Sequence, residues 1–427
     1  MLTAYVRFSS LMLPEHAAAR HVLAVCLALL TWLVDARATA RHPEHSAEVR
    51  ALWVTRNALV SPHTIARMVN AAQRGGFNTI VLQVRGRGDA YYSSSFEPRP
   101  AELAARPSFD PLGETIALAR PAGLKVHAWV GVNLVSSAVD LPASRHHVIY
   151  RQPDWLMVPR ELAKPLHRLD PKSPTYLSQL ARWTRARRDE IEGLYTSPIH
   201  PWAVTHLTAV ITELVTNYEL DGLHLDYVRF PNEEFDYSRA AIQQFKRSIL
   251  PELSTVDRRR ADSEERDNPL AYPDLFRDQW TSFRRSRLTA LVASVRTAAK
   301  AVRPDIVLSA AVVPELTHAT ESRLQDWRAW LDHSLVDVVC PMAYTPDVAA
   351  FERQIAEAQA VAAGPRVWAG IGAYRLTTSG TLQHIAAARR LQTAGVILFS
   401  YDALVAPPNS VESLAALGRA AFNGGPQ

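Results

Sequence analysis

The 427-residue sequence predicts a (β/α)8 TIM barrel, an α/β fold in which eight parallel strands alternate with helices and close into a cylinder. Eight short apolar, β-branched runs recur along the chain, and four of the seven start-to-start spacings between them are 29 to 31 residues, about one strand plus one helix. Near-continuous apolar strands that alternate with helices are typical of a parallel sheet covered on both faces. A doubly wound open sheet is the alternative, but no Gly-rich phosphate loop follows the first run.

The predicted elements follow one another in a regular order. The eight strands are expected to begin near Arg50, Thr79, Lys125, Asp221, Asp305, Val336, Arg366 and Gly395. Helices are expected over residues 62–74, 111–122, 201–218, 275–302, 321–331, 348–362, 381–393 and 411–422. Several of these helices open with a capping residue or an early proline, as in Ser61-Pro62, Asp110-Pro111 and Asp347.

Two long insertions follow the third and fourth predicted strands, over residues 143–199 and 231–272. In a barrel of this type the loops after the strands lie on the C-terminal face, where active sites are built. The charged stretch 257–267 within the second insertion reads as a solvated surface segment.

The N-terminal segment is expected to be a targeting signal. An apolar run over residues 22–34 follows Arg20 and His21, and small residues at alternating positions follow it up to Ala40. Such a run is too short to cross a bilayer comfortably, so we expect a signal peptide over 1–40 and the barrel domain over 41–427. Cleavage would give an exported, periplasmic or extracellular protein with no stable membrane span and with Cys340 as its one cysteine. An uncleaved anchor is the alternative.

The composition excludes several classes of protein. The chain has 47 Lys and Arg against 42 Asp and Glu, a formal net charge of +5, and 48% hydrophobic residues. These values are those of a globular protein and not of a disordered or fibrous one. The positive excess is small and spread along the chain, which disfavours a nucleic-acid partner.

Polar and aromatic side chains gather where the predicted strands end. Aromatic rings can pack on the apolar face of a sugar while charged and amide groups hydrogen-bond its hydroxyls, so these residues indicate a poly- or oligosaccharide site. The candidate substrate-binding residues are Arg56, Gln83, Arg85, Asp89, His127, Trp129, Asn133, His224, Arg229, Tyr344, Tyr374 and Asp402. Trp129 is the expected sugar platform, whereas Trp53 and Trp368 are expected to be core residues of the barrel. Neither a metal-binding motif nor a nucleophile elbow is present in the sequence, so no metal and no cofactor are expected.

Asp226 is the principal catalytic candidate. It ends the strand DGLHLDYVRFP, where alternation places His224, Asp226 and Val228 on one face and Tyr227 on the other. A carboxylate in a barrel mouth is costly unless it is paired or used, so the alternatives are a glycosidase carboxylate and a structural ion pair with Arg229 or His224.

Glycoside hydrolysis normally needs a second carboxyl group. Glu315 is the preferred partner because it follows the fifth predicted strand, which neighbours the fourth in a closed barrel. Asp89 and Asp402 are the other contenders, although each could equally hold its own loop in place.

The chain from about Arg50 onward resembles the glycosyl hydrolase-like 10 family of exported bacterial TIM-barrel proteins. The matching segments are ALWVTR, FNTIVLQVRGRGDAYY, FDPLGETIALARPAGLKVHAWVGVN, HPWAVTHL, NYELDGLHLDYVRFP and CPMAY. The resemblance implies a hydrolase of O-glycosidic bonds in a bacterial envelope or extracellular polysaccharide, for example the glycan strands of peptidoglycan. It also implies that Asp226 is the acid of the fourth strand.

The same segment departs from related patterns. Many members of that family carry a second acidic residue directly after the strand-four acid, where this chain has Tyr227. Relative to the chitinase-type strand, His224 and Val228 replace two of the acids, whereas an amylase-like reading would make Asp226 a nucleophile and Glu315 the acid. A non-catalytic glycan-binding barrel therefore stands beside the hydrolase as an alternative.

Overall fold

The computed structural model describes residues 48–422. The expected signal peptide over 1–40 lies outside these residues. None of the described helices is long and apolar enough to span a membrane.

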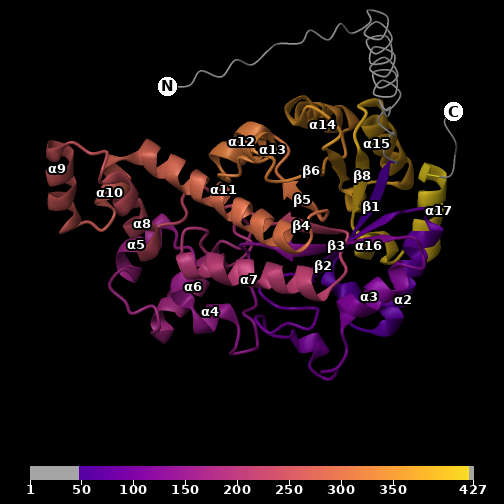
Figure 1. Cartoon of the computed structure of the whole chain (residues 1–427), viewed down its shortest axis with the longest axis horizontal. Helices are drawn as coiled ribbons and strands as arrows, with labels where there is room; N and C mark the ends of the chain where they lie inside the picture. Colours follow the sequence, from indigo (N-terminus) through magenta and orange to yellow (C-terminus); the bar gives the residue numbers. More distant parts are fainter. Residues whose placement is uncertain (1–47, 423–427) are drawn as a thin grey trace, which may run out of the picture. The chain divides into compact units, whose positions relative to one another are not determined.

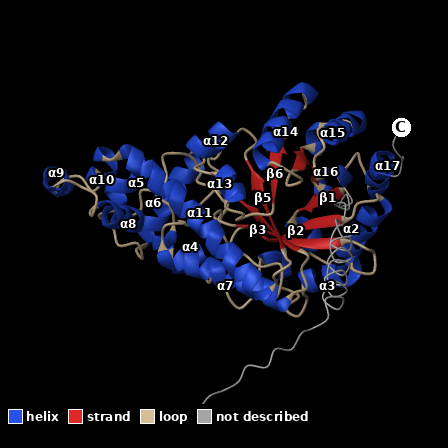
Figure 2. Ribbon diagram, turned by 45° about the horizontal axis from the view of Figure 1, so that its top comes forward, coloured by secondary structure: helices blue, strands red, loops and turns tan. Residues whose placement is uncertain are grey.

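The eight predicted strands form a closed parallel barrel in which each strand pairs with its neighbours in chain order and β8 pairs with β1. Figure 2 shows this barrel surrounded by helices. The strands are β1 Val49–Val54, β2 Thr79–Arg85, β3 Lys125–Gly131, β4 Gly222–Asp226, β5 Val307–Val312, β6 Val338–Ala343, β7 Trp368–Ile371 and β8 Gly395–Phe399. The predicted fold class is therefore confirmed.

Most of the outer helices lie where the sequence predicts them. They are α2 Pro62–Arg74, α3 Pro111–Ala119, α7 Pro201–Asn217, α11 Arg277–Val302, α14 Val348–Ala362, α15 Thr378–Arg390 and α17 Val411–Phe422. Ser61, Asp110 and Asp347 cap α2, α3 and α14 by accepting hydrogen bonds from backbone N–H groups of the first turn. Short helical turns follow several strands, namely η1 Arg56–Leu59, η2 Ala101–Leu103, η4 Ala373–Arg375 and α16 Tyr401–Val405.

The prediction of one continuous helix over 321–331 is wrong. The chain forms α12 (Leu316–Glu321) and α13 (Trp327–Asp332), with Leu324 at φ 53° between them. The buried Gln325 side chain in this break accepts a hydrogen bond from Val313 N and donates to carbonyl oxygens. These hydrogen bonds hold the segment between the two helices against the barrel. The helix expected over 275–302 is confirmed as α11, which begins two residues later, and the short helix α10 (Ala271–Leu275) precedes it.

The two insertions fold into further helices. The first contains α4 Val148–Arg151, η3 Pro153–Trp155, α5 Arg160–Leu166 and α6 Pro174–Ala186, and the second contains α8 Arg239–Ile249, α9 Thr255–Glu265 and α10. In Figure 1 the α8–α10 segment and the start of α11 extend away from the strands. Ala261 is the one residue of α9 that is buried, which agrees with the predicted solvated segment.

The barrel has two apolar cores. A large one fills the space between the strands and the outer helices. A smaller one fills the barrel itself and is formed by Ala51, Trp53, Val81, Trp129, Val338, Cys340, Trp368 and Ile397. The three tryptophans thus lie within the barrel, and Trp53 and Trp129 of this inner core also line a cavity at its C-terminal end.

Candidate active site

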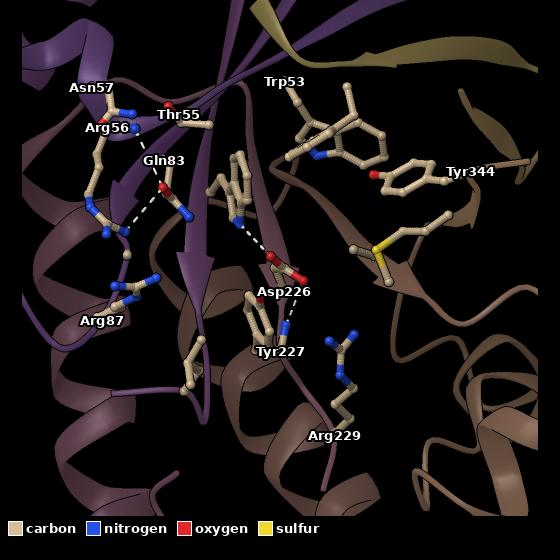
Figure 3. A pocket seen from close by; sticks show the side chains of 16 residues that line it. Trp53, Thr55, Arg56, Asn57, Gln83, Arg87, Asp226, Tyr227, Arg229 and Tyr344 are labelled. Carbon is tan, nitrogen blue, oxygen red and sulfur yellow. Dashed lines mark hydrogen bonds between the residues drawn. The ribbon is translucent and has the colours of Figure 1, made fainter. Parts of the chain in front are cut away.

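A cavity of about 300 Å³ opens at the C-terminal ends of the strands (Figure 3). Strands β1 to β6 and β8 and the loops after them supply its walls. The lining residues are Trp53, Thr55, Arg56, Asn57, Gln83, Gly86, Arg87, Trp129, Leu134, Asp226, Tyr227, Arg229, Ala311, Met342, Tyr344 and Phe399. Among the sixteen, Asp226 is the one carboxylate.

Asp226 is the last residue of β4 and is 6% exposed. Its Oδ2 accepts a hydrogen bond from the indole Nε1 of Trp129 at 3.0 Å, and its Oδ1 accepts one from the backbone N of Tyr227 at 2.7 Å. Burial raises the pKa of this carboxyl above its ordinary value, although the Arg229 charge and both hydrogen bonds oppose the rise. The group is therefore held in a fixed orientation and retains its proton to a higher pH than a free aspartate.

Tyr227 lies in the cavity, so the prediction that alternation turns it away is wrong. Strand β4 ends at Asp226, and Tyr227 adopts φ 49°, which interrupts the two-residue period of the strand. Val228, expected beside Asp226, is instead buried in the outer core. Burial and the neighbouring Asp226 raise the pKa of Tyr227 to about 12, so its hydroxyl is protonated at neutral pH.

Arg229 lines the cavity and pairs with Glu192 from the first insertion at 3.1 Å. Its guanidinium also lies 4.6 Å from the ring centroid of Tyr227. Glu192 in turn accepts a hydrogen bond from the Tyr195 hydroxyl at 2.8 Å. Although burial opposes ionisation of Glu192, the Arg229 charge and these contacts lower its pKa. Sequence reasoning missed Glu192 because nothing near it in the chain marks it as a neighbour of β4.

His224 serves the inner core and does not line the cavity. Its Nε2 accepts a hydrogen bond from Trp53 Nε1 at 3.0 Å, so Nδ1 carries the proton and donates to Ser309 Oγ at 2.9 Å. His127 lies beside Trp368, with ring centroids 5.5 Å apart. Burial lowers the pKa of each histidine to about 3, and both are neutral at physiological pH.

Glu315 does not reach the cavity. It is exposed at the start of α12, where its carboxylate accepts a hydrogen bond from the Gln354 side chain on α14. The other two contenders hold backbone in place. Asp89 accepts hydrogen bonds from Gly86 N and Arg87 N, whereas Asp402 accepts one from Thr55 N at 2.9 Å.

The remaining candidates divide between the cavity and its supports. Arg56, Gln83, Trp129 and Tyr344 line it together with Asp226 and Arg229. Arg85 is buried in an ion pair with Glu97 at 2.6 Å, and Asn133 donates a hydrogen bond to Thr196 O at 2.9 Å. Tyr374 is 51% exposed and packs edge-on against Tyr344 outside the lining.

Several lining residues were not assigned to the site from the sequence, or were assigned to the core. They are Trp53, Thr55, Asn57, Gly86, Arg87, Leu134, Tyr227, Ala311, Met342 and Phe399. Met342 and Phe399 lie at or next to strand ends, and this position was a usable signal. Apolar residues at strand ends are, however, equally consistent with a packed core. Within residues 48–422 no group of three or more His, Cys, Asp and Glu side chains is placed to hold a metal ion.

The closed barrel of eight parallel strands defines the class of the protein as a TIM barrel, with a buried carboxylate in the cavity at the C-terminal ends of its strands. Residues 48–374 match the family described as Glycosyl hydrolase-like 10, and the chain belongs to this family. The resemblance seen in the sequence is thereby confirmed.

Two bacterial relatives carry the name glycosyl hydrolase. DigH of Escherichia coli K12 is 24% identical over 310 residues, which cover 68% of this chain and 60% of DigH. YngK of Bacillus subtilis is 24% identical over 171 residues, 39% of this chain and 28% of YngK. The chain thus matches less than two thirds of either relative's length.

Solved structures share the fold at low sequence identity. The glycoside hydrolase domain of PgaB (BpsB) from Bordetella bronchiseptica has a TM-score of 0.56 at 15% identity, covering 87% of this chain and 98% of that domain. A β-galactosidase from Rahnella sp. R3 has a TM-score of 0.58 at 13% identity, covering 89% of this chain and 57% of that protein. These likenesses concern the barrel and not the substrate.

Proposed function

We propose that the protein is an exported glycoside hydrolase that cleaves a bacterial envelope or extracellular polysaccharide, such as the glycan strands of peptidoglycan, with Asp226 as its key carboxylate. One observation carries the proposal. Asp226 is buried at the C-terminal end of β4, inside a cavity that aromatic side chains help to line, and burial raises the pKa of its carboxyl above the ordinary value. Membership of a glycosyl hydrolase-like family supports the same reaction class.

The cavity supplies one of the two carboxyl groups that glycoside cleavage normally uses, the general acid. A protonated Asp226 can give its proton to the leaving glycosidic oxygen, which is the role of the raised-pKa carboxyl in such enzymes. The Trp129 indole fixes the orientation of the carboxyl through its hydrogen bond. Tyr344 and Phe399, which are half-buried, offer apolar surface on which a sugar ring can pack.

The decisive experiment compares wild type with Asp226→Asn on a panel of envelope glycans, including peptidoglycan strands with and without stem peptides. Loss of the acid is expected to lower kcat/KM by at least ~10²-fold. Glu315→Gln is the matched control, since Glu315 is exposed outside the cavity and its loss is expected to leave turnover unchanged. Full activity of Asp226→Asn would refute the assignment, whereas loss in Glu315→Gln alone would restore Glu315 as the acid.

A non-catalytic glycan-binding barrel is the second candidate. The observation in its favour is that Asp226 is the sole carboxylate among the described cavity-lining residues, whereas glycoside hydrolysis normally uses two. Binding of a glycan by wild type, with no release of reducing ends from any glycan in the panel, would support this candidate over the enzyme.

Export rests on the predicted signal over residues 1–40. The test is to express the full chain in a bacterial host and to determine the N-terminal sequence of the protein in each cell fraction. A periplasmic or secreted protein that begins near residue 41 is expected, and a full-length cytoplasmic protein would contradict it.

A further inference from the structure

We propose that Arg56 and Arg87 form an anion subsite and that the substrate is therefore an acidic glycan, with a carboxylate or phosphate group bound beside the Asp226 cavity. This inference rests on the proposed function, because it specifies the chemistry of the polysaccharide that the same cleft binds.

The two arginines are brought together by the loops after neighbouring strands. Arg56 opens η1 after β1, and Arg87 follows β2. Figure 3 shows their guanidinium groups next to each other at one side of the cavity. Gln83 Oε1 faces Arg56 N and Nη1 at 3.4 Å each. A Cβ atom at Gly86 would overlap the Arg56 guanidinium, so the glycine leaves the space that Arg56 occupies.

This pair of charges lacks a protein counterion. Among the described residues, no carboxylate lies within salt-bridge distance of Arg56 or Arg87, whereas Arg229 across the cavity is already paired with Glu192. Burial and the neighbouring Arg56 charge lower the pKa of Arg87, an effect that Tyr227, Asp89 and Asp140 oppose only in part. Two like charges held side by side are unfavourable in the free protein, and an anionic ligand would relieve that repulsion.

Nearby acidic groups do not neutralise the pair. The Asp89 carboxylate is engaged by the backbone N–H groups of Gly86 and Arg87. Glu102 and Asp140 line the adjoining cavity, but neither is within ion-pair distance of the two guanidiniums. Arginine is suited to such a role, since its planar fork binds carboxylate and phosphate groups with two parallel hydrogen bonds.

Arg56 and Arg87 also lie between two neighbouring cavities. A second cavity of about 520 Å³ lies between the loop after β2 and the first insertion, and it shares Arg56 and Arg87 with the Asp226 cavity. Tyr91, Arg99 and His147 contribute to its walls. A ligand that occupies both cavities would lie beside these two shared side chains. The cleft therefore suits a chain of several sugar units, with the acidic group on a sugar near the one held at Asp226.

The test uses matched glycans that differ only in charge. One is a carboxylate-bearing polysaccharide that the wild type cleaves, and its partner is the same polysaccharide with the carboxylates chemically reduced to alcohols. A phosphate-bearing glycan forms a third arm, which distinguishes the two anion sources. Wild type is expected to prefer an anionic glycan over the reduced one by about 10- to 100-fold in kcat/KM, the scale of lost charge-assisted hydrogen bonds.

Arg87→Gln is expected to lose this preference, because kcat/KM should fall much further on the anionic glycan than on the reduced one. Gly86→Ala should weaken the preference while keeping every charge, because it displaces the Arg56 guanidinium. Arg247→Gln, which alters an exposed arginine on α8, should leave it intact. Equal cleavage of charged and reduced glycans by wild type, or an equal loss on both in Arg87→Gln, would overturn the inference and leave the proposed function standing.

Binding measurements separate the two proposals if no glycan is cleaved. Calorimetric titration of wild type and Arg87→Gln with the same glycans should show tighter, salt-sensitive binding of the anionic form by wild type alone. That result would uphold the anion subsite while the hydrolase proposal fails. Binding that is indifferent to charge would overturn the subsite independently of turnover.

Discussion

At the scale of single residues, the surroundings of Asp226 determine how its carboxyl is oriented and how readily it is protonated. Burial favours the protonated carboxyl, whereas the Trp129 indole, the Tyr227 backbone N–H and the Arg229 charge favour the carboxylate. Trp129, predicted as a sugar platform, lines the cavity and also orients this acid. A change at Trp129 should therefore alter the properties of the Asp226 carboxyl.

Removing the indole N–H should change the pH dependence of turnover. Trp129→Phe deletes a hydrogen bond that stabilises the ionised carboxylate, so the pKa of Asp226 should rise further. If Asp226 acts as the acid, activity falls as pH rises through its pKa, and the alkaline limb of kcat/KM should move to higher pH in the variant. Trp183→Phe on α6, whose indole contacts Glu161, is the matched control. A limb that moves to lower pH would contradict the role of this hydrogen bond.

Arg85 lies at a strand end, but it forms a buried ion pair that stabilises the fold. Its guanidinium pairs with the buried Glu97, which also contacts His206 at 3.1 Å. Burial opposes ionisation of Glu97, but Arg85 and His206 outweigh it and lower the pKa to about 2. A carboxyl with a depressed pKa stabilises the fold above its ordinary pKa of 4.5, and this contribution is lost as pH falls toward about 2.

Glu97→Gln should therefore destabilise the protein by about 3–5 kcal/mol at pH 7, because it leaves the Arg85 charge buried without its partner. Urea unfolding followed by circular dichroism measures the difference in free energy of unfolding. The difference should shrink as pH is lowered from about 4.5 toward 2. Glu412→Gln, at an exposed surface pair, should have little effect. An unfolding midpoint equal to wild type at pH 7 would show that the pair does not stabilise the fold.

At the scale of elements, the ends of the strands shape the site. Strand β4 ends at Asp226, and the positive φ of Tyr227 turns the chain into the loop that carries Arg229. Gln325, in the break between α12 and α13, supports this turn from outside. Its side chain accepts from Val313 N at 2.9 Å and donates to Val228 O and Ala311 O at 3.2 and 3.3 Å.

Replacing the Gln325 side chain should destabilise the fold and loosen the turn that follows β4. Gln325→Leu removes three hydrogen bonds from a fully buried side chain, and we expect a loss of about 3 kcal/mol in the free energy of unfolding. Urea denaturation tests this value. Gln243→Leu, on the exposed face of α8, provides the same substitution without buried partners. Equal stability of the two variants would mean that the break is held by its backbone alone.

At the scale of the whole molecule, the barrel was predictable and the composition of its site only in part. The strand period is repeated eight times and each repeat is locally encoded, so the closed sheet follows from the sequence. The insertions carry no such period, and their helices were not predicted. Asp226 could be singled out because a charge ends a buried strand. Glu192 could not, because only the folded first insertion brings it to Arg229. His127 and His224 were placed at the mouth by their strands, but strand position does not reveal depth within the barrel.

The architecture of the whole molecule also predicts which part of it unfolds first. A closed barrel has no edge strand and buries its strands on both faces, whereas α9 extends from the second insertion and buries only Ala261. Polar links also hold it: Lys246 contacts Asp262 at 3.0 Å and Glu265 at 2.5 Å, and the Tyr272 hydroxyl donates to Asp262 at 2.8 Å.

Polar links of this kind at the surface contribute little, so α9 should unfold locally while the barrel stays closed. Native-state hydrogen exchange should therefore show amide protection in Thr255–Glu265 at least ~10²-fold below that of β4, whose amides need global opening. The helix α7, which packs on the barrel, is the matched reference and should exchange as slowly as the strands. Protection in α9 equal to that in α7 would place it in the same cooperative unit as the barrel.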